Sequence, residues 1–155
     1  MNSAAGKFRH RNLPLLLLQA REHVISRFRP ILNAHGITEQ QWRIVRALLD
    51  TGPMEPRQIG LLCRISSPSL AGVLSRMEEF GLIKRKRFDH DQRRLHVSLT
   101  PRSRALSARM APQIESTYRD IEALIGAEFA ARFYGALDEL IGALAAHEPA
   151  ANASE

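Results

Sequence analysis

A single cysteine, Cys63, is present in the sequence, so no disulfide bond can form within the chain. A chain without disulfides suits the reducing cytosol. Long apolar runs are missing too, because Leu13–Leu18 contains a proline and is soon followed by charged residues. A secretory signal needs roughly 7–15 consecutive apolar residues and a membrane-spanning helix needs roughly 20. We therefore expect a cytoplasmic protein without a membrane partner.

The residue patterns of metal sites and of common enzymes are also missing. None of the six histidines pairs with another at i, i+4 spacing, and no cysteine cluster accompanies them, which argues against a metal site. Neither a Gly-rich phosphate-binding loop nor a G-x-S-x-G motif occurs. Cys63 follows Leu61 and Leu62 and is expected to be a buried apolar residue. The sequence thus predicts no catalytic residue, no metal and no cofactor.

Positive charge exceeds negative charge, with 22 Lys and Arg against 16 Asp and Glu and a formal net charge of +6. The surplus favours a polyanionic partner, because basic side chains that neutralise phosphates release condensed counterions. A merely basic surface is the alternative. The distribution is more informative than the total, since Lys84–Arg94 contains six basic residues and only two acidic ones.

Helical spacing and capping signals predict the order of the elements. One helix is expected over about Leu13–Asn33 and ends at His35-Gly36. Thr38 and Gln41 have the spacing of a capping box, so a second helix begins there and stops before Gly52-Pro53.

A helix-turn-helix is expected next. A short helix over Pro56–Cys63 and a tight turn at Arg64–Ser66 lead into a second helix. This helix has Ser67 as N-cap and Pro68 as its first residue, and it ends at Gly81. Its apolar positions repeat at helical spacing and form a stripe to be buried: Leu70, Val73, Leu74 and Met77.

After that helix the period changes from helical to alternating. Ile83–Phe88 is expected to be a strand, Asp89–Gln92 a turn and Leu95–Leu99 a half-buried strand. Thr100-Pro101 opens a helical region that runs to about His147 with a break near Gly126. The expected fold class is mainly α, a winged helix-turn-helix with a two-stranded wing, whose N- and C-terminal helices form a dimerisation domain.

Four regions are expected: an N-terminal arm with a dimerisation helix (1–36), the winged helix-turn-helix (37–100), C-terminal dimerisation helices (101–147) and a flexible tail (148–155). The C-terminal helices carry more apolar residues than one small layer can bury, so a second copy is expected to cover them. These residues are Leu106, Met110, Ile114, Tyr118, Ile121, Leu124, Ile125, Phe129, Phe133, Leu137, Leu140, Ile141 and Leu144. A two-fold dimer would place its two reading helices roughly 34 Å apart, one turn of DNA.

The tip and outward face of the second helix of the motif carry small or polar residues and one arginine. A helix that lies in the major groove, about 12 Å wide, needs small residues near its tip so that the backbone can approach. Serine hydroxyls and N-terminal amides can also bond phosphate. We expect contacts with DNA from Ser66, Ser67, Pro68, Ser69 and Arg76. An ordinary amphipathic surface helix is the alternative.

The basic hairpin after this helix is the expected wing. A two-stranded ribbon with an arginine near its tip fits the narrow minor groove, whose negative potential attracts guanidinium groups. Asp91 lies two residues before Arg93 and can hold that side chain by a charge-assisted pair. The expected wing residues of the DNA site are Lys84, Arg85, Asp91, Arg93 and Arg94. A solvated run of charge is the alternative.

At these residues the chain resembles MarR-type transcription regulators. Asp91–Thr100 fits their D-x-R-x-x-x-V-x-L-T wing, and Met77–Arg85 fits the exit of their recognition helix. The N-terminal part, over Asn12–Glu22, Phe28–Asn33 and Thr38–Arg43, is similar to the homoprotocatechuate-type regulators, which repress aromatic-acid catabolism, and to repressors of nicotinate breakdown. The resemblance covers nearly the whole chain. It implies a homodimer, a palindromic operator of double-stranded DNA, and release by a small phenolic or pyridine carboxylate.

The resemblance also assigns roles to residues. It implies that Arg93 is the minor-groove arginine and that Asp91 is its brace. Several relatives have an arginine where this chain has Gly72. Recognition of the bases is therefore expected to depend more on Arg76 or on the shape of the DNA.

An anionic aromatic effector needs a cation and a flat apolar wall. The candidates are Arg21, His23, Trp42 and Arg46, because the resemblance places their helices beside the effector pocket. Each has a plainer interpretation: Trp42 sits at a hydrophobic-staple position and can be core, and the arginines can be solvated or ion-paired, as Arg46 with Asp50.

The sequence therefore predicts a homodimeric, nucleoid-associated repressor that an aromatic acid releases from its operator. A DNA-binding or architectural protein without a working effector site is the alternative. An enzyme acting on an aromatic acid is a third hypothesis, and the lack of any nucleophile, base or metal cluster argues against it.

Overall fold

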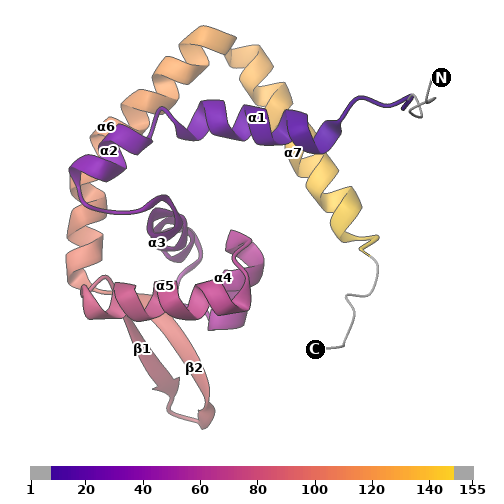
Figure 1. The fold of residues 1–155 in the computed structure, drawn as a ribbon. Helices are drawn as coiled ribbons and strands as arrows, with labels where there is room; N and C mark the ends of the chain where they lie inside the picture. Colours follow the sequence, from indigo (N-terminus) through magenta and orange to yellow (C-terminus); the bar gives the residue numbers. More distant parts are fainter. Residues whose placement is uncertain (1–7, 149–155) are drawn as a thin grey trace, which may run out of the picture. The chain divides into compact units, whose positions relative to one another are not determined.

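The computed structural model describes residues 8–148, and the chain divides into two compact units between Ile114 and Glu115 (Figure 1). The first residues of the expected arm and nearly all of the expected tail lie outside the described residues. Within 8–148, no helix is long and apolar enough to cross a membrane, and no group of three or more potential metal-ligating side chains occurs.

The N-terminal part forms two helices, α1 (Leu13–Ile25) and α2 (Arg29–Ala34), where the sequence predicted one. Pro30 explains the difference, because it has no N–H to donate and its ring would clash with the carbonyl four residues earlier in a continuous helix. The chain turns instead, and the amides of Arg27 and Phe28 bond to carbonyls three residues earlier, at 3.2 and 3.0 Å.

The body of the first unit consists of α3 (Glu39–Thr51), α4 (Pro56–Cys63) and α5 (Ser67–Glu79). The predicted capping box of α3 is confirmed: Thr38 Oγ1 accepts from the Gln41 N–H at 3.1 Å, and Gln41 Oε1 accepts from the Thr38 N–H at 3.0 Å. Between α4 and α5 the backbone is left-handed, with a φ of +55° at the C-cap of α4, so the predicted helix-turn-helix is present.

The wing is an antiparallel hairpin of β1 (Ile83–Phe88) and β2 (Asp91–Leu99). Its turn contains only Asp89-His90, because Asp91 and Gln92, which the sequence analysis placed in the turn, belong to β2, where Asp91 pairs with Phe88 of β1. Met54 adds a bridge that the sequence did not predict: its backbone exchanges hydrogen bonds with Val97 at 3.1 and 2.7 Å. This bridge joins the segment before α4 to the base of the wing.

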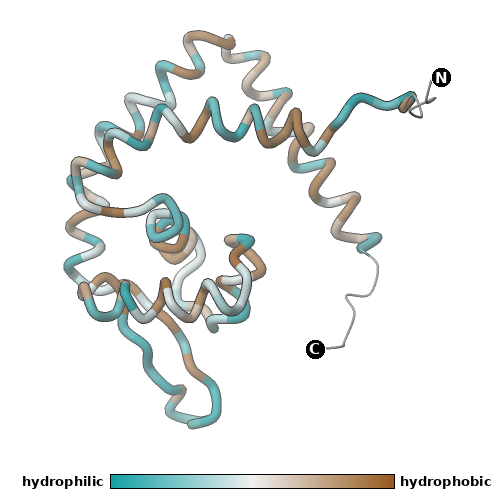
Figure 2. Tube along the Cα trace, viewed as in Figure 1, coloured by the Kyte–Doolittle hydropathy of each residue, from teal (hydrophilic) through white to brown (hydrophobic). Residues whose placement is uncertain are grey.

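The core of the first unit lies between α3, α4, α5 and the base of the wing. Its most deeply buried side chains come from all of these elements: Ile44, Leu48, Ile59, Leu74, Met77, Ile83 and Val97. The strands beyond this base are largely hydrophilic (Figure 2). The wing thus projects from a buried base as a polar ribbon.

The C-terminal part contains α6 (Pro101–Ile125) and α7 (Ala127–Ala145), which are separated at Gly126, where φ is +88°. The predicted break is therefore confirmed. Met110 and Ile114 are buried. Figure 2 shows hydrophobic segments along α7. Large apolar side chains at the end of α6 and along α7 are exposed: Leu124, Ile125, Phe129, Phe133, Tyr134, Ile141 and Leu144.

Candidate functional site

The N-terminal tip of α5 is open to solvent. Ser66 is its N-cap, so the helix begins one position earlier than predicted and Pro68 is its second residue. Ser66, Ser67, Pro68 and Ser69 are all exposed, and Ser66 Oγ donates to Ser69 Oγ at 3.1 Å. The predicted stripe on the other face is buried. The tip therefore offers small side chains and backbone amides, as a groove-reading helix requires.

Arg76 lies over Gly72 on the outer side of α5. A Cβ at position 72 would be 3.3 Å from Arg76 Nη1, so the glycine leaves the space that the guanidinium occupies. Helical side chains lean toward the N-terminus of their helix. The guanidinium of Arg76 therefore lies closer to the N-terminal tip of α5 than its own backbone does.

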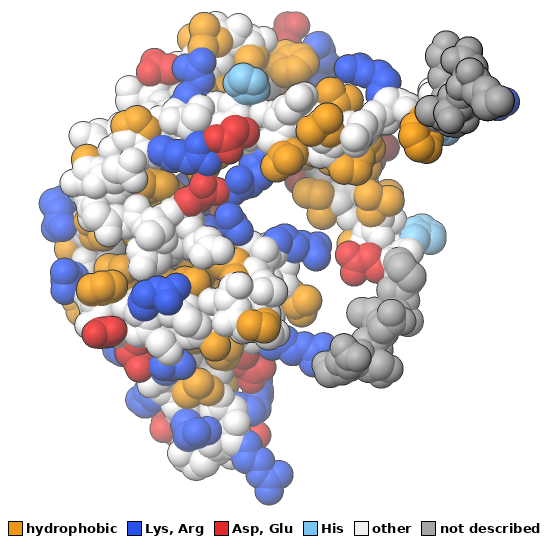
Figure 3. Space-filling model, in the orientation of Figure 1, with side chains coloured by type: hydrophobic (Ala, Val, Ile, Leu, Met, Phe, Trp, Pro, Cys, Tyr) orange, Lys and Arg blue, Asp and Glu red, His pale blue; other side chains and the backbone are white. Residues whose placement is uncertain are grey.

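Arg93 is exposed near the end of the wing. Asp91 Oδ1 accepts a hydrogen bond from the backbone N–H of Arg93 at 3.0 Å. This differs from the charge-assisted pair with the Arg93 side chain that the sequence predicted. The short Asp side chain reaches the amide two residues on, an Asx-type contact, and so fixes the backbone while the guanidinium stays exposed. Lys84 is also exposed, at the other end of the hairpin, and Figure 3 shows Lys and Arg side chains on the surface of the wing.

Two further predicted DNA contacts are held in ion pairs. Arg85 bonds Glu78 of α5 at 3.1 and 3.2 Å, and this hydrogen bond lowers the pKa of Glu78 and raises that of Arg85. Arg94 Nε donates to Glu55 Oε1 at 2.6 Å, and its guanidinium lies 4.7 Å from the centre of the Phe88 ring. Both arginines would have to leave their carboxylates to bind phosphate.

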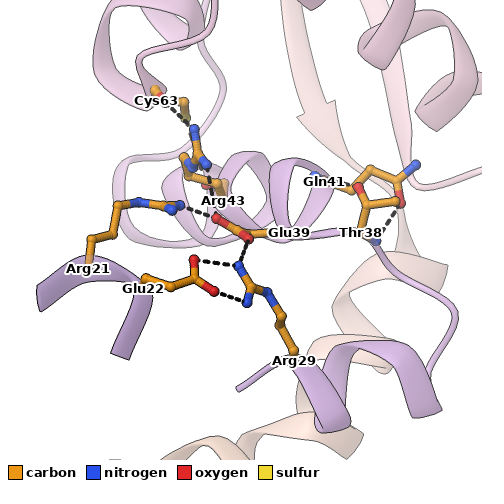
Figure 4. A network of polar contacts seen from close by, with 8 residues as sticks. All are labelled: Arg21, Glu22, Arg29, Thr38, Glu39, Gln41, Arg43 and Cys63. Atoms are coloured by element: carbon orange, nitrogen blue, oxygen red, sulfur yellow. Dashed lines mark hydrogen bonds and ion pairs between the residues drawn. The ribbon is translucent and has the colours of Figure 1, made fainter. Parts of the chain in front are cut away.

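Arg21, a predicted effector residue, belongs to a network of ion pairs between α1, α2 and α3 (Figure 4). The carboxylate of Glu39 accepts from Arg21, from Arg29 at 3.4 Å and from Arg43 at 3.4 Å, and Glu22 also pairs with Arg29. Desolvation raises the pKa of Glu39, but the hydrogen bonds from Arg21 and Arg29 outweigh it and leave that pKa below its usual value. Three guanidinium groups thus meet two carboxylates.

The other three effector candidates make no hydrogen bond or ion pair with this network among the described residues, although the charge of His23 contributes to lowering the pKa of Glu22. Arg46 pairs with Asp50 at 3.1 Å, as the plainer interpretation expected. Trp42 is half-buried on α3, and His23 is exposed on α1. No contact in the described part of the chain joins any of the three to Arg21.

Glu39, Glu22 and Arg29 were absent from the sequence-predicted sites. The i, i+4 spacing of Glu39 and Arg43 was visible in the sequence and could have indicated one pair. The pairs that Arg21 and Arg29 make with Glu39 span 18 and 10 residues. No local period marks such pairs, because they depend on how α1, α2 and α3 pack.

Comparisons with known proteins agree with this geometry. A family profile described as MarR family matches residues 35–94. The chain is 46% identical over 132 residues to the homoprotocatechuate degradative operon repressor of Escherichia coli, covering 85% of this chain and 89% of that protein. The crystal structure of transcriptional regulator PA4135 has a TM-score of 0.82 at 42% identity, covering 84% of this chain and 96% of that one. NadR in complex with 4-hydroxyphenylacetate has a TM-score of 0.78 at 35% identity, covering 90% and 97%.

Proposed function

The chain belongs to the MarR family of transcriptional regulators, and from this premise we propose that it is a homodimeric repressor that leaves a palindromic operator when a small aromatic or heteroaromatic acid binds. The observation that carries the proposal is the pairing of an exposed, small-residue tip on α5 with an exposed arginine on the adjacent wing. Together they match the major- and minor-groove parts of one duplex.

The exposure and charge of the residues on α5 and on the wing indicate which part of the DNA each one contacts. Ser66–Ser69 bring the tip of α5 into the major groove, and Arg76 reaches base edges there. Arg93 enters the minor groove with its backbone fixed by Asp91. Lys84 bonds phosphate directly, and Arg85 and Arg94 do so after exchanging their carboxylate partners. We place DNA recognition in residues 37–100 and dimerisation in 1–36 and 101–147; nearly all of the expected tail, 148–155, lies outside the described residues.

An aromatic acid is the proposed effector class. The Escherichia coli relative is described as a homoprotocatechuate degradative operon repressor, and the NadR structure contains 4-hydroxyphenylacetate. In this chain Trp42 would provide the flat wall, and Arg21 or Arg46 would bind the carboxylate in exchange for Glu39 or Asp50, with His23 close to Arg21 in sequence. Release requires that the effector favours a conformation in which the two α5 helices are wrongly spaced.

A competition titration tests the DNA-binding part. Fluorescence anisotropy would measure binding to the DNA upstream of the protein's own gene, with random duplex as competitor. A specific reader prefers its site by roughly 10³ or more. Equal competition by random DNA would instead support the architectural alternative.

A further inference from the structure

A hollow of about 390 Å³ lies between the start of α3, the later part of α5 and the first turns of α6, and none of the proposed effector residues lines it. Its walls carry Arg76, Arg102, Arg109 and His35. No aspartate or glutamate of the described residues lines it. The three arginines are therefore its only charged side chains among the described residues with His neutral, and all three are positive.

Two of the three arginines are available to a ligand. Within residues 8–148, Arg76 and Arg109 make no ion pair, and both are exposed. Arg102 is held in place, since its Nη1 donates to the Phe80 carbonyl oxygen at 2.8 Å. The N-terminus of α3 also lines the hollow at Thr38, and its helix dipole adds positive potential.

The hollow has an apolar part as well. Ile37, Leu82, Leu106 and Phe80 contribute to its lining, and Ile37 and Leu82 are buried core residues. Gln41, which is 93% buried, also lines it. Its Oε1 is occupied by the capping box, whereas its amide nitrogen is turned away from Thr38 (Figure 4).

We propose that this hollow binds a small organic anion, whose carboxylate or phosphate pairs with Arg76 and Arg109 and whose apolar part packs on Leu82 and Leu106. The volume falls in the lower part of the range of small-molecule pockets, about 300–1,000 Å³. A DNA backbone would find charge here too. The buried apolar lining favours an organic ligand, because a phosphodiester chain has no apolar group to place on it.

The site has a consequence for DNA binding, because Arg76 also lies on the outer side of α5. An anion that pairs with the Arg76 guanidinium withdraws it from the groove. Occupation of the hollow should therefore lower affinity for the operator, independently of the proposed effector site.

The test uses the full chain with Arg21→Ala, Trp42→Ala and Arg46→Ala, which removes the flat wall and both candidate arginines of the proposed effector site. Titration with 4-fluorobenzoate and with 4-fluorophenyl phosphate, followed by fluorine NMR, measures binding without DNA and separates the two headgroups. Arg109→Glu is compared with Arg104→Glu, an exposed arginine of the same helix that does not line the hollow.

We expect saturable binding of at least one probe, weakened about tenfold or more by Arg109→Glu and within about twofold of the parent in Arg104→Glu. No saturable binding, or equal loss in both variants, would overturn the proposal. So would loss of DNA affinity in Arg109→Glu with no anion bound, which would make the hollow part of the DNA contact. Because the fluorine NMR titration needs no operator DNA, the first two failures are distinct from failure of the proposed function.

Discussion

Arg43 and Cys63 exchange hydrogen bonds: Arg43 Nη1 donates to the Cys63 carbonyl oxygen at 2.8 Å, and the Cys63 thiol donates to the Arg43 carbonyl oxygen at 3.7 Å. The contact joins α3 to the last residue of α4, immediately before the left-handed turn of the helix-turn-helix. Arg43 also pairs with Glu39, which pairs with Arg21 of α1. A continuous polar path therefore runs from α1 to the turn that precedes α5.

Arg43→Ala is expected to lower the free energy of unfolding by about 1–2 kcal/mol, because the Cys63 carbonyl at the end of α4 loses its donor. Urea denaturation followed by circular dichroism measures the change. Arg46→Ala serves as the control, since it removes an exposed i, i+4 pair worth only about 0.5 kcal/mol. Equal effects of the two substitutions on the free energy of unfolding would show that the contact between Arg43 and Cys63 does not stabilise the fold.

The Cys63 thiol should react slowly in the folded protein. It is 3% exposed, and burial raises its pKa, so little thiolate forms near neutral pH and little of it is accessible. We expect labelling by a thiol-specific reagent to be far slower in the native protein than in denaturant, and operator affinity to survive peroxide. A native labelling rate equal to that of the unfolded chain would contradict the assignment of Cys63 to the core.

Glu39 should make stability depend on pH in the acid range. Its folded pKa lies below the usual value of 4.5, so its ion pairs stabilise the protein above that pH, and this contribution disappears as pH falls through the folded pKa. Glu39→Gln should therefore flatten the acid side of the stability curve, measured as urea midpoint against pH. Glu115→Gln, an exposed change on α6, is the control. Parallel curves for wild type and Glu39→Gln would refute the linkage.

Arg93→Ala should weaken operator binding by about 1–3 kcal/mol while the dimer stays intact, because it removes the guanidinium from the minor groove. Anisotropy gives the affinity, and sedimentation gives the oligomeric state. Arg104→Ala removes the same charge from α6 and should have a small effect. Unchanged affinity in Arg93→Ala would undo the wing assignment.

Glu78→Gln should strengthen binding to DNA, because it releases Arg85 to contact phosphate. The salt dependence, measured as log affinity against log salt concentration, should steepen by about one unit for one new phosphate contact. Glu79→Gln makes the same charge change at a neighbouring exposed position. If the two variants behave alike, pairing with Glu78 does not restrain Arg85.

Local signals allowed much of the fold to be predicted from the sequence. The Thr38–Gln41 capping box, the buried stripe of α5 and the alternation in β2 each depend on a few neighbouring residues, and all three are confirmed. Pro30 was also a local signal, and overlooking it merged α1 and α2 into one helix. The turn of the wing is shorter than predicted because pairing with Phe88 extends β2 to Asp91.

The candidate site was less predictable, because its contacts connect distant segments. The exposure of the α5 tip and of Arg93 could be predicted from the spacing of apolar and charged residues in the sequence. The pairing of Arg94 with Glu55, 39 residues away, did not. The Met54–Val97 bridge and the Glu39 network likewise depend on packing between elements, which no periodicity records.

The most direct test is release of the protein from the DNA upstream of its own gene. The preformed complex is titrated, with anisotropy as readout, with hydroxyphenylacetates and hydroxylated pyridine carboxylates. The expected result is that one compound releases the wild-type protein saturably but leaves the Trp42→Ala complex bound to the same DNA. A complex that no compound dissociates, or that random DNA displaces as readily as operator, would contradict an effector-controlled repressor.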